Sequence, residues 1–227
     1  FHLSLGDDGS FERLTGLASS EAIVYTSVSV DAGGVVIAGK FSGSVDIAGS
    51  VYDASGLEDA FVIAYDAVGE QRWHRVLGGP GTDSFWDVVA LPDGGVLLAG
   101  GTDGTVVIDG ITVTSTGAPQ GWLVRLRVDH TCAAQRTYAG VGTLSVSGDV
   151  FARLALTGPG SVLGVELVGP QNVAIASLRD DLSARFVAGP FRGEGLDDVR
   201  ASADGFMVAM TPESFSRDPP RPLDPRS

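Results

Sequence analysis

The chain has 227 residues and a net charge of −13, which disfavours nucleic acid and anionic membranes as partners because both are bound through clustered Lys and Arg. An apolar fraction of 44% argues against disorder, and its 32 glycines follow no collagen-like triplet. No stretch reaches the roughly 18 apolar residues of a membrane span, and the single cysteine, Cys132, excludes an internal disulfide. Many short strands joined by many turns remain as the fold class.

The first predicted elements are two short strands at the start of the chain. Residues 1–5 alternate apolar and polar side chains, Gly6-Asp-Asp-Gly9 is a turn signal, and residues 10–14 follow as a second strand. The next unit has predicted strands near 24–30, 34–41, 60–66 and 71–77. A second unit has them near 85–91, 95–101, 121–128 and 133–138.

These two units are copies of one another. Residues 33–39, Gly-Gly-Val-Val-Ile-Ala-Gly, return at 94–100 as Gly-Gly-Val-Leu-Leu-Ala-Gly, an offset of 61. The apolar trio Phe61, Ile63 and Tyr65 returns at the same offset as Trp122, Val124 and Leu126. Each trio has period two, which indicates strands with one face more deeply buried.

Weaker copies follow. The segment from Phe151 to Leu163 resembles the segment from Phe85 to Leu97, which predicts third-unit strands near 150–156, 161–168, 172–178 and 182–188. A last half unit spans about 197–210, and residues 211–227 form a proline-rich tail or linker.

Internal repeats of this length predict an all-β fold, a β-propeller of about four blades with four antiparallel strands each. The predicted propeller spans 1–210, with units at about 15–77, 78–138 and 139–188. The last blade would be closed by residues 189–210 together with 1–14. Such closure would remove exposed sheet edges. A fragment of a larger ring is the alternative.

The segment from Trp73 to Gly100, with its Gly-Gly-Pro-Gly-Thr-Asp loop, resembles the SBBP-type β-propeller repeat of bacterial secreted and surface proteins. The stretches Gly43-Ser-Val-Asp-Ile-Ala-Gly49 and Asp59-Ala-Phe-Val-Ile-Ala-Tyr-Asp66 are similar to versions in myxobacterial surface lipoproteins. The second unit departs from the pattern, since Ala134 replaces the Trp. The resemblance implies a propeller at the cell surface, in the periplasm or outside the cell, and it implies no activity.

The sequence supplies no catalytic, cofactor or metal motif. His2, His74 and His130 have no ligand spacing to another His or Cys, and no Gly-x-Ser-x-Gly elbow is present. The loop Gly78-Gly-Pro-Gly-Thr-Asp83 lacks the Lys and the following helix of a phosphate-binding loop. Asp7, Asp8, Asp180 and Asp181 are expected to bond turn backbone, with a structural calcium ion as an alternative.

Large aromatic side chains are predicted to be structural. Trp73, Trp86 and Trp122, together with Phe61, occupy strand positions that other units fill with apolar residues. Packing between blades is therefore expected, although a stacking platform for sugar is the alternative reading of the three tryptophans.

Two inserts between the second and third strands of their units, at 42–58 and 103–120, suggest a contact surface. The second reads as a β-hairpin that turns at Asp109-Gly110, whereas the third unit crosses with only Gly169-Pro-Gln171. One face is thus predicted to be built up over two adjacent blades. The candidate contact residues are Val51, Tyr52, Val107, Asp109, Ile111 and Val113. The alternative is that the hairpins only cover blade edges.

The functional hypothesis is a non-catalytic, exported interaction or scaffold module whose partner is a protein or a second copy. The alternatives are a propeller hydrolase or lyase acting on an extracellular polymer, and a carbohydrate-binding module. Convergent Asp, Arg and His with shifted pKa values would favour the enzyme, exposed Trp or Tyr would favour sugar, and a large apolar hairpin surface would favour a protein.

Overall fold

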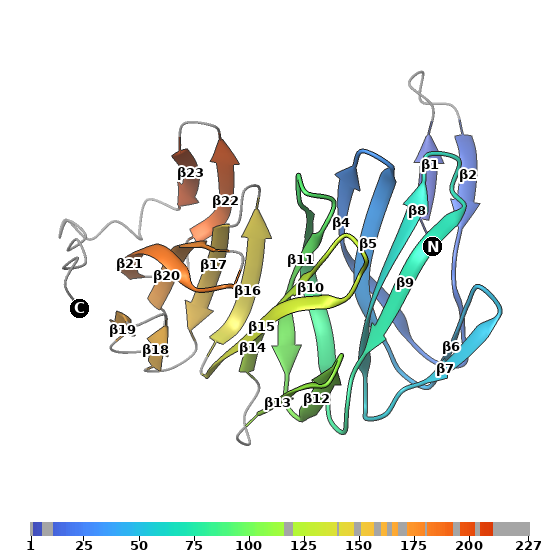
Figure 1. The fold of residues 1–227 in the computed structure, drawn as a ribbon, viewed down its shortest axis with the longest axis horizontal. Helices are drawn as coiled ribbons and strands as arrows, with labels where there is room; N and C mark the ends of the chain where they lie inside the picture. Colours follow the sequence, from blue (N-terminus) through green and yellow to red (C-terminus); the bar gives the residue numbers. More distant parts are fainter. Residues whose placement is uncertain are drawn as a thin grey trace.

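The structure, a computed structural model, is all-β: the residues it describes form strands joined by turns and loops, with no helix among them. The described residues are 2–5, 11–115, 120–139, 141–147, 151–156, 160–162, 165–167, 172–179, 181–192, 196–202 and 205–210. Every sheet pairing between named strands is antiparallel (Figure 1). Among these residues, no helix has the length and apolar character needed to cross a membrane.

The first two units form four-stranded sheets in which strand order follows chain order. The first sheet consists of β4 (Ile23–Asp31), β5 (Gly34–Phe41), β8 (Asp59–Asp66) and β9 (Gln71–Leu77). The second consists of β10 (Asp83–Ala90), β11 (Val96–Thr102), β14 (Gln120–Leu126) and β15 (Cys132–Ala139). All eight strands begin and end within two residues of the predicted spans, which confirms the strand assignments of these two units.

The third unit also forms a four-stranded sheet, but its first two strands were predicted wrongly. It consists of β16 (Val141–Ser147), β17 (Phe151–Leu156), β20 (Asn172–Leu178) and β21 (Ala184–Arg192). Residues 151–156, predicted as the first strand, are therefore the second. The alternation of apolar side chains is the same in both strands, so it locates a strand without giving its place in the sheet.

The prediction of inserts in only two units is also wrong. Each sheet has a short hairpin between its second and third strands: β6–β7 (Ser44–Ile47 and Ser50–Asp53), β12–β13 (Thr105–Ile108 and Ile111–Thr114) and β18–β19 (Gly160–Val162 and Val165–Leu167). The two-residue strand β3 (Ala18–Ser19) pairs with β6. Residues 161–168, predicted as a sheet strand, belong mostly to the third hairpin. All three hairpins lie at one end of the sheets (Figure 1), which we call the hairpin end.

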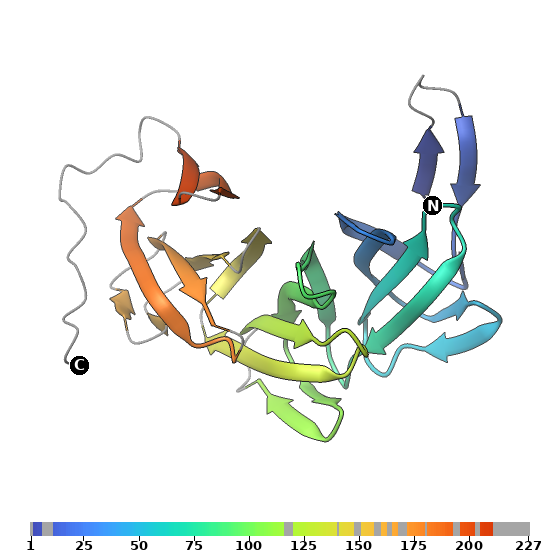
Figure 2. The same cartoon turned by 45° about the horizontal axis from the view of Figure 1, so that its top comes forward.

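The three sheets stand side by side in an open arc (Figure 2), with their first strands on the inner side and their fourth strands on the outer side. Strand β10 packs against β4, β5 and β8, and β16 packs against β10, β11 and β14. Hydroxyl groups join the inner strands β4 and β10: Thr26 Oγ1 donates to the Phe85 carbonyl at 2.8 Å, and Ala90 N donates to Ser29 Oγ at 3.0 Å. Each sheet is thus covered by the next.

Both faces of the first sheet are apolar. Alternate residues of β5 and β8, including Val36, Ala38 and Val62, join Val88, Leu98 and Trp122 of the second sheet in one buried cluster. The residues between them, including Ile37, Phe61 and Ile63, form a second cluster on the opposite face. Burial on both faces explains why these strands read as nearly continuous apolar runs, although the sheet is antiparallel.

The predicted closure of a last blade by the two ends is absent from the described residues. Strands β1 (His2–Leu5) and β2 (Phe11–Thr15) form one two-stranded sheet, and β22 (Leu196–Ser202) and β23 (Gly205–Met210) form another. The two pairs lie at opposite ends of the arc (Figure 2). Strand patterns specify which strands can pair, but they do not specify how far a stack of sheets curves. The predicted tail, 211–227, lies outside the described residues.

Candidate binding site

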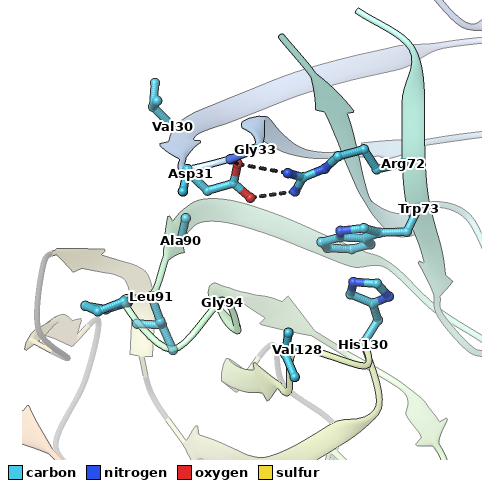
Figure 3. Close-up of a pocket in the computed structure, with 12 residues that line it drawn as sticks. Val30, Asp31, Gly33, Arg72, Trp73, Ala90, Leu91, Gly94, Val128 and His130 are labelled. Atoms are coloured by element: carbon cyan, nitrogen blue, oxygen red, sulfur yellow. Dashed lines mark hydrogen bonds and ion pairs between the residues drawn. The ribbon is translucent and has the colours of Figure 1, made fainter.

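A pocket of about 670 Å³ lies where the first two sheets meet, at the end opposite the hairpins. We call this end the turn end, because the tight β4–β5, β8–β9, β10–β11 and β14–β15 turns are there. The pocket, which we call the junction pocket, is shown in Figure 3. Its lining residues are Val30, Asp31, Ala32, Gly33, Arg72, Trp73, Ala90, Leu91, Pro92, Gly94, Val128 and His130.

One wall of the junction pocket is an ion pair between the first turn and the outer strand. Arg72 of β9 donates to both carboxylate oxygens of Asp31, at 2.5 and 3.1 Å. Asp31 Oδ1 also accepts the amide hydrogen of Gly33 at 2.8 Å, which fixes the carboxylate on the turn. The Arg72 guanidinium holds the pKa of Asp31 below its ordinary value, so this side chain is an anion at neutral pH.

A second wall is the aromatic pair Trp73 and His130, whose rings stack with centroids 4.2 Å apart and planes 21° apart (Figure 3). Trp73 comes from β9 and His130 from the β14–β15 turn, so the pair bridges the two sheets. His130 has a φ of 64°, and its amide donates to the Arg127 carbonyl at 2.8 Å. A non-glycine residue with left-handed backbone is disfavoured by about 1–2 kcal/mol. Glycine occupies the same place in the first sheet, where Gly69 has a φ of 78°.

Arg75 of β9 fixes the position of that turn. Its guanidinium donates to the His130 carbonyl at 2.8 Å and to Asp109 Oδ1 at 2.9 Å. Asp109, at the tip of the β12–β13 hairpin, also accepts the amide hydrogen of Cys132 at 2.6 Å. One side chain therefore ties the outer strand of the first sheet to both a turn and a hairpin of the second.

Another part of the lining of the junction pocket is apolar and includes Ala90, Leu91, Pro92 and Val128. The pKa of His130 is lowered, first by burial and further by the Arg72 and Arg75 charges, against the opposing effect of Asp129. The imidazole is therefore neutral at pH 7. No Ser, Cys, Lys or Tyr is among the described residues that line the cavity. Asp31 and Arg72 neutralise one another, and the neutral His130 ring is stacked on Trp73.

The six predicted contact residues lie on the two hairpins and divide into two groups. Val51, Val107 and Ile111 have exposed side chains. Their neighbours Val45, Ile47, Val106 and Ile108 are fully buried in the two apolar clusters. The hairpins thus fill the outer wedge between neighbouring sheets and keep only one face in solvent.

The other three predicted contact residues bond or pack within the molecule. The Tyr52 hydroxyl lies 2.7 Å from Nε2 of His74, and the two rings meet edge to face. Asp109 is paired with Arg75, and Val113 is half-buried. The pKa of His74 is lowered by burial. These contacts give the hairpins a structural role.

The four predicted core residues are buried to different extents. Trp122 and Phe61 are fully buried, and Trp122 stacks on Phe85 with ring centroids 5.2 Å apart. Trp122 Nε1 donates to Gln135 Oε1 at 3.2 Å. Trp73 and Trp86 are half-buried. Trp73 packs against the core cluster and also lines the junction pocket.

Two buried carboxylates occupy the hairpin end. Asp59 accepts the Ser55 amide hydrogen at 3.0 Å and Asp83 accepts that of Gly79 at 2.8 Å, while Oδ1 of each lacks a hydrogen-bond partner. Burial raises the pKa of Asp59, and it raises that of Asp83 to about 6, with the nearby Asp59 and Asp103 charges adding to the shift. Two carboxylates do not make a metal site by themselves: no group of three His, Cys, Asp or Glu side chains suited to a metal ion occurs in the described part of the chain.

The turn aspartates singled out in the sequence are only partly described. Asp181 Oδ1 accepts the Ser183 amide hydrogen at 2.9 Å, which is the expected turn-capping role. Asp7, Asp8 and Asp180 lie outside the described residues, and so does the side chain of His2. Cys132 is buried, and burial raises the pKa of its thiol.

Sequence reasoning missed the junction pocket, although one signal for it was available. At the offset of 61 that relates the first two units, His130 falls on Gly69. A bulky side chain with left-handed backbone, at a position that the sister unit fills with glycine, is a departure from the repeat that singles out His130. What the offset does not show is that Trp73, 57 positions earlier in the chain, lies against that ring.

Comparison with known proteins adds no relative: the chain matches neither a protein-family model nor a curated protein. The described structure therefore defines the class, an all-β chain of consecutive four-stranded antiparallel sheets with a hairpin in each. The resemblance to SBBP-type repeats stays a prediction.

Proposed function

We propose that the successive sheets are blades of a β-propeller and that the chain is a non-catalytic, exported module which binds a protein segment in the junction pocket. The export part of the proposal derives from the resemblance to SBBP-type repeats. The binding part derives from one observation, the meeting of an aromatic pair, an internal ion pair and an apolar wall in a single cavity.

The chemistry of the junction pocket favours binding over catalysis. Asp31, Arg72 and His130 converge there, the combination that would favour an enzyme. The Arg72 guanidinium, however, holds Asp31 as an anion, and His130 is a neutral ring stacked on Trp73. A general base needs a pKa near the working pH and a nucleophile or substrate proton within reach. The lining instead offers fixed polar groups around apolar contacts, as ligand sites do.

The turn end supports this role better than the hairpin end. The hairpins use half of their apolar side chains to fill the core, and Asp109 and Tyr52 are engaged in internal bonds. In the junction pocket, by contrast, the exposed Val128 lines a cavity together with Ala90 and Leu91 (Figure 3). An extended protein segment that inserts one apolar side chain against them is the ligand that fits this arrangement.

The proposal is tested by selecting binders from a phage-displayed library of random peptides and measuring their affinity by fluorescence polarisation. Val128→Asp places a charge in the apolar wall at an exposed position and should weaken the selected peptides at least tenfold. Val68→Asp, an exposed valine in the equivalent turn of the first sheet, is the matched control and should leave affinity unchanged.

Three results would contradict the proposal. Peptides that bind Val128→Asp as tightly as the unaltered chain would remove the junction pocket from the contact. Loss of binding in Val107→Asp would move the contact to the hairpins. Glycans bound on an array by the unaltered chain and lost in Val128→Asp, in the absence of selected peptides, would make the module a carbohydrate binder, for which the Trp73–His130 stack would be the relevant feature.

A further inference from the structure

The first sheet carries an uncovered apolar strip on the face turned away from the second sheet. Val28 and Val30 of β4 are 61% and 77% exposed. They lie directly opposite Ile37 and Val35 in the β4–β5 ladder, so all four share one face. Ile37 belongs to the buried cluster of that face. The strip is therefore the inner margin of an apolar core, left open to solvent.

The second sheet shows what covers this position. Val88 of β10 occupies the position in the second sheet that Val28 of β4 occupies in the first. Val88 lies opposite Leu98 of β11, and Val28 lies opposite Ile37 of β5. Leu98 and Ile37 are 61 positions apart, which is the offset between the two units. Val88 is only 2% exposed, because strands β4, β5 and β8 of the preceding sheet pack on β10. The exposed fraction of the side chain at this position is thus 61% in the first sheet, where no sheet covers it, and 2% in the second, where the preceding sheet lies over it.

Irregularities in strand register identify the two end pairs as complementary halves of a sheet. Every first–second ladder shifts near the start of its first strand, and β22–β23 does so as well: the shifts lie at Tyr25/Ser27, Phe85/Asp87, Val141/Thr143 and Leu196/Asp198. The third–fourth ladders shift near the end of the third strand, at Ala64/Tyr65, Arg125/Leu126 and Ser177/Leu178, and β1–β2 matches them with its shift at Ser4/Leu5. The β20–β21 ladder has a second shift at Val173/Ile175, so the shift that all of these pairs share is the one near the end. β22–β23 is therefore a first–second pair and β1–β2 a third–fourth pair.

We propose that β22–β23 of a second copy of this chain pairs with β1 through β23 and covers Val28 and Val30. The completed sheet has the order β22–β23–β1–β2, which is the order of the three complete sheets. Its register follows from the second sheet, where Leu98 lies opposite Val124. Val208 of β23 lies at the same distance from the register shift of its ladder as Leu98 does, and Leu3 of β1 at the same distance as Val124. Val208 is therefore expected to lie opposite Leu3.

The open arc argues for a second copy over closure within one chain. The two half sheets lie at opposite ends of the arc, separated by three complete sheets (Figure 2). Two copies placed head to tail supply both missing halves to each other and close a ring of eight sheets, a size that propellers adopt. Such a two-fold ring also removes the free edges of β1 and β23. The inference rests on the proposed propeller architecture and is independent of the junction pocket.

The association is measured by size-exclusion chromatography with light scattering on the full chain over a range of concentrations. The expected mass is twice 23.3 kDa. Val28→Asp, at the strip residue that does not line the junction pocket, should weaken the dimer at least tenfold, and circular dichroism should show its strand content unchanged because the side chain is exposed. Val107→Asp, also exposed, is the matched control and should remain a dimer. Val128→Asp should remain one too, which separates failure of this inference from failure of the pocket.

Cysteine pairing tests the predicted register and the source of the covering strands. In a Cys132→Ala background, a Leu3→Cys chain mixed with a Val208→Cys chain of different mass should form the mixed disulfide dimer on oxidation. A chain that carries both cysteines should not form the disulfide within a monomer. If it does, β23 pairs with β1 of the same chain, and the proposed second copy is wrong. The inference would also be overturned by a chain that stays monomeric at high concentration, or by a Val28→Asp dimer as tight as the original.

Discussion

The two ends of the first two sheets place aspartate and apolar side chains in opposite environments. At the turn end, Asp31 is paired with Arg72 and its pKa is lowered, whereas at the hairpin end Asp83 is fully buried without a cation and its pKa is raised to about 6. Apolar residues differ likewise, since Ile108 of a hairpin is buried in the core while Val128 of a turn faces solvent. The comparison teaches that the two ends place buried charge and apolar side chains differently, and the proposed binding role of the turn end depends on that difference.

The largest effect should come from removing a buried side chain of the hairpin end. Ile108→Ala should lower the free energy of unfolding by about 2–5 kcal/mol, because it leaves a cavity between the sheets. Val107→Ala, the adjacent exposed residue, is the control and should change it by less than about 0.5 kcal/mol. Urea unfolding followed by circular dichroism measures both, and equal effects would show that the hairpin is not part of the core.

The two aspartates should respond to pH in opposite directions. The folded pKa of Asp83, about 6, lies above its ordinary value of 3.8, so the folded state binds more protons and stability falls as pH rises from about 4 to about 6. Asp83→Asn removes this loss, and its stability relative to the unaltered chain should increase across that window and then level off. Urea unfolding at a series of pH values measures the difference.

Asp31→Asn is the control of opposite sign. Because Arg72 lowers the pKa of Asp31, the ion pair stabilises the fold at neutral pH, and this contribution is lost as the pH falls below the ordinary value of 3.8. Asp31→Asn should therefore be less stable than the unaltered chain at pH 7, and the difference should shrink in acid. If the stability difference from the unaltered chain changed with pH in the same direction for Asp31→Asn and Asp83→Asn, the proposed electrostatic contrast between the two ends would be wrong.

The smallest effect on stability is expected for His130→Gly. Relief of the left-handed backbone gains about 1 kcal/mol, and loss of the stack on Trp73 costs about 0.5–1.5 kcal/mol, so the two nearly cancel. Trp73 should nevertheless become more exposed, which tryptophan fluorescence would report as a red shift. Gly69→Ala is the contrasting variant, since it adds strain at a φ of 78° without any ring to stack, and it should be destabilising.

The sequence predicted the first two sheets well because two signals agree there. The apolar alternation marks each strand, and the offset of 61 places the same strand twice. In the third unit only the alternation remained, and it could not distinguish Phe151–Leu156 as a first strand from the same residues as a second strand. A hairpin as short as β18–β19 gave no separate pattern, so it was taken for part of a sheet strand.

Much less of the candidate site could be predicted. The two inserts predict a contact surface on the hairpins, but alternate apolar residues of the hairpins pack inward. Period two does not say which face of a hairpin meets the core. The junction pocket depends on contacts between units, such as Trp73 with His130 and Arg75 with Asp109. Contacts of this kind depend on how sheets stack and curve, which repeats in a sequence do not encode directly.

The turn between the third and fourth strands offers one interchangeable position per repeat. Gly69, His130 and Leu182 all have left-handed backbone there, and they give respectively an absent side chain, a stacked ring and a fully buried anchor. Since the loop length is the same in the three repeats, a substitution at this position changes the side chain that the turn presents without changing the backbone of the repeat. A library of substitutions at residue 130, which already has a side chain on left-handed backbone, would use the chain as an adaptable recognition framework.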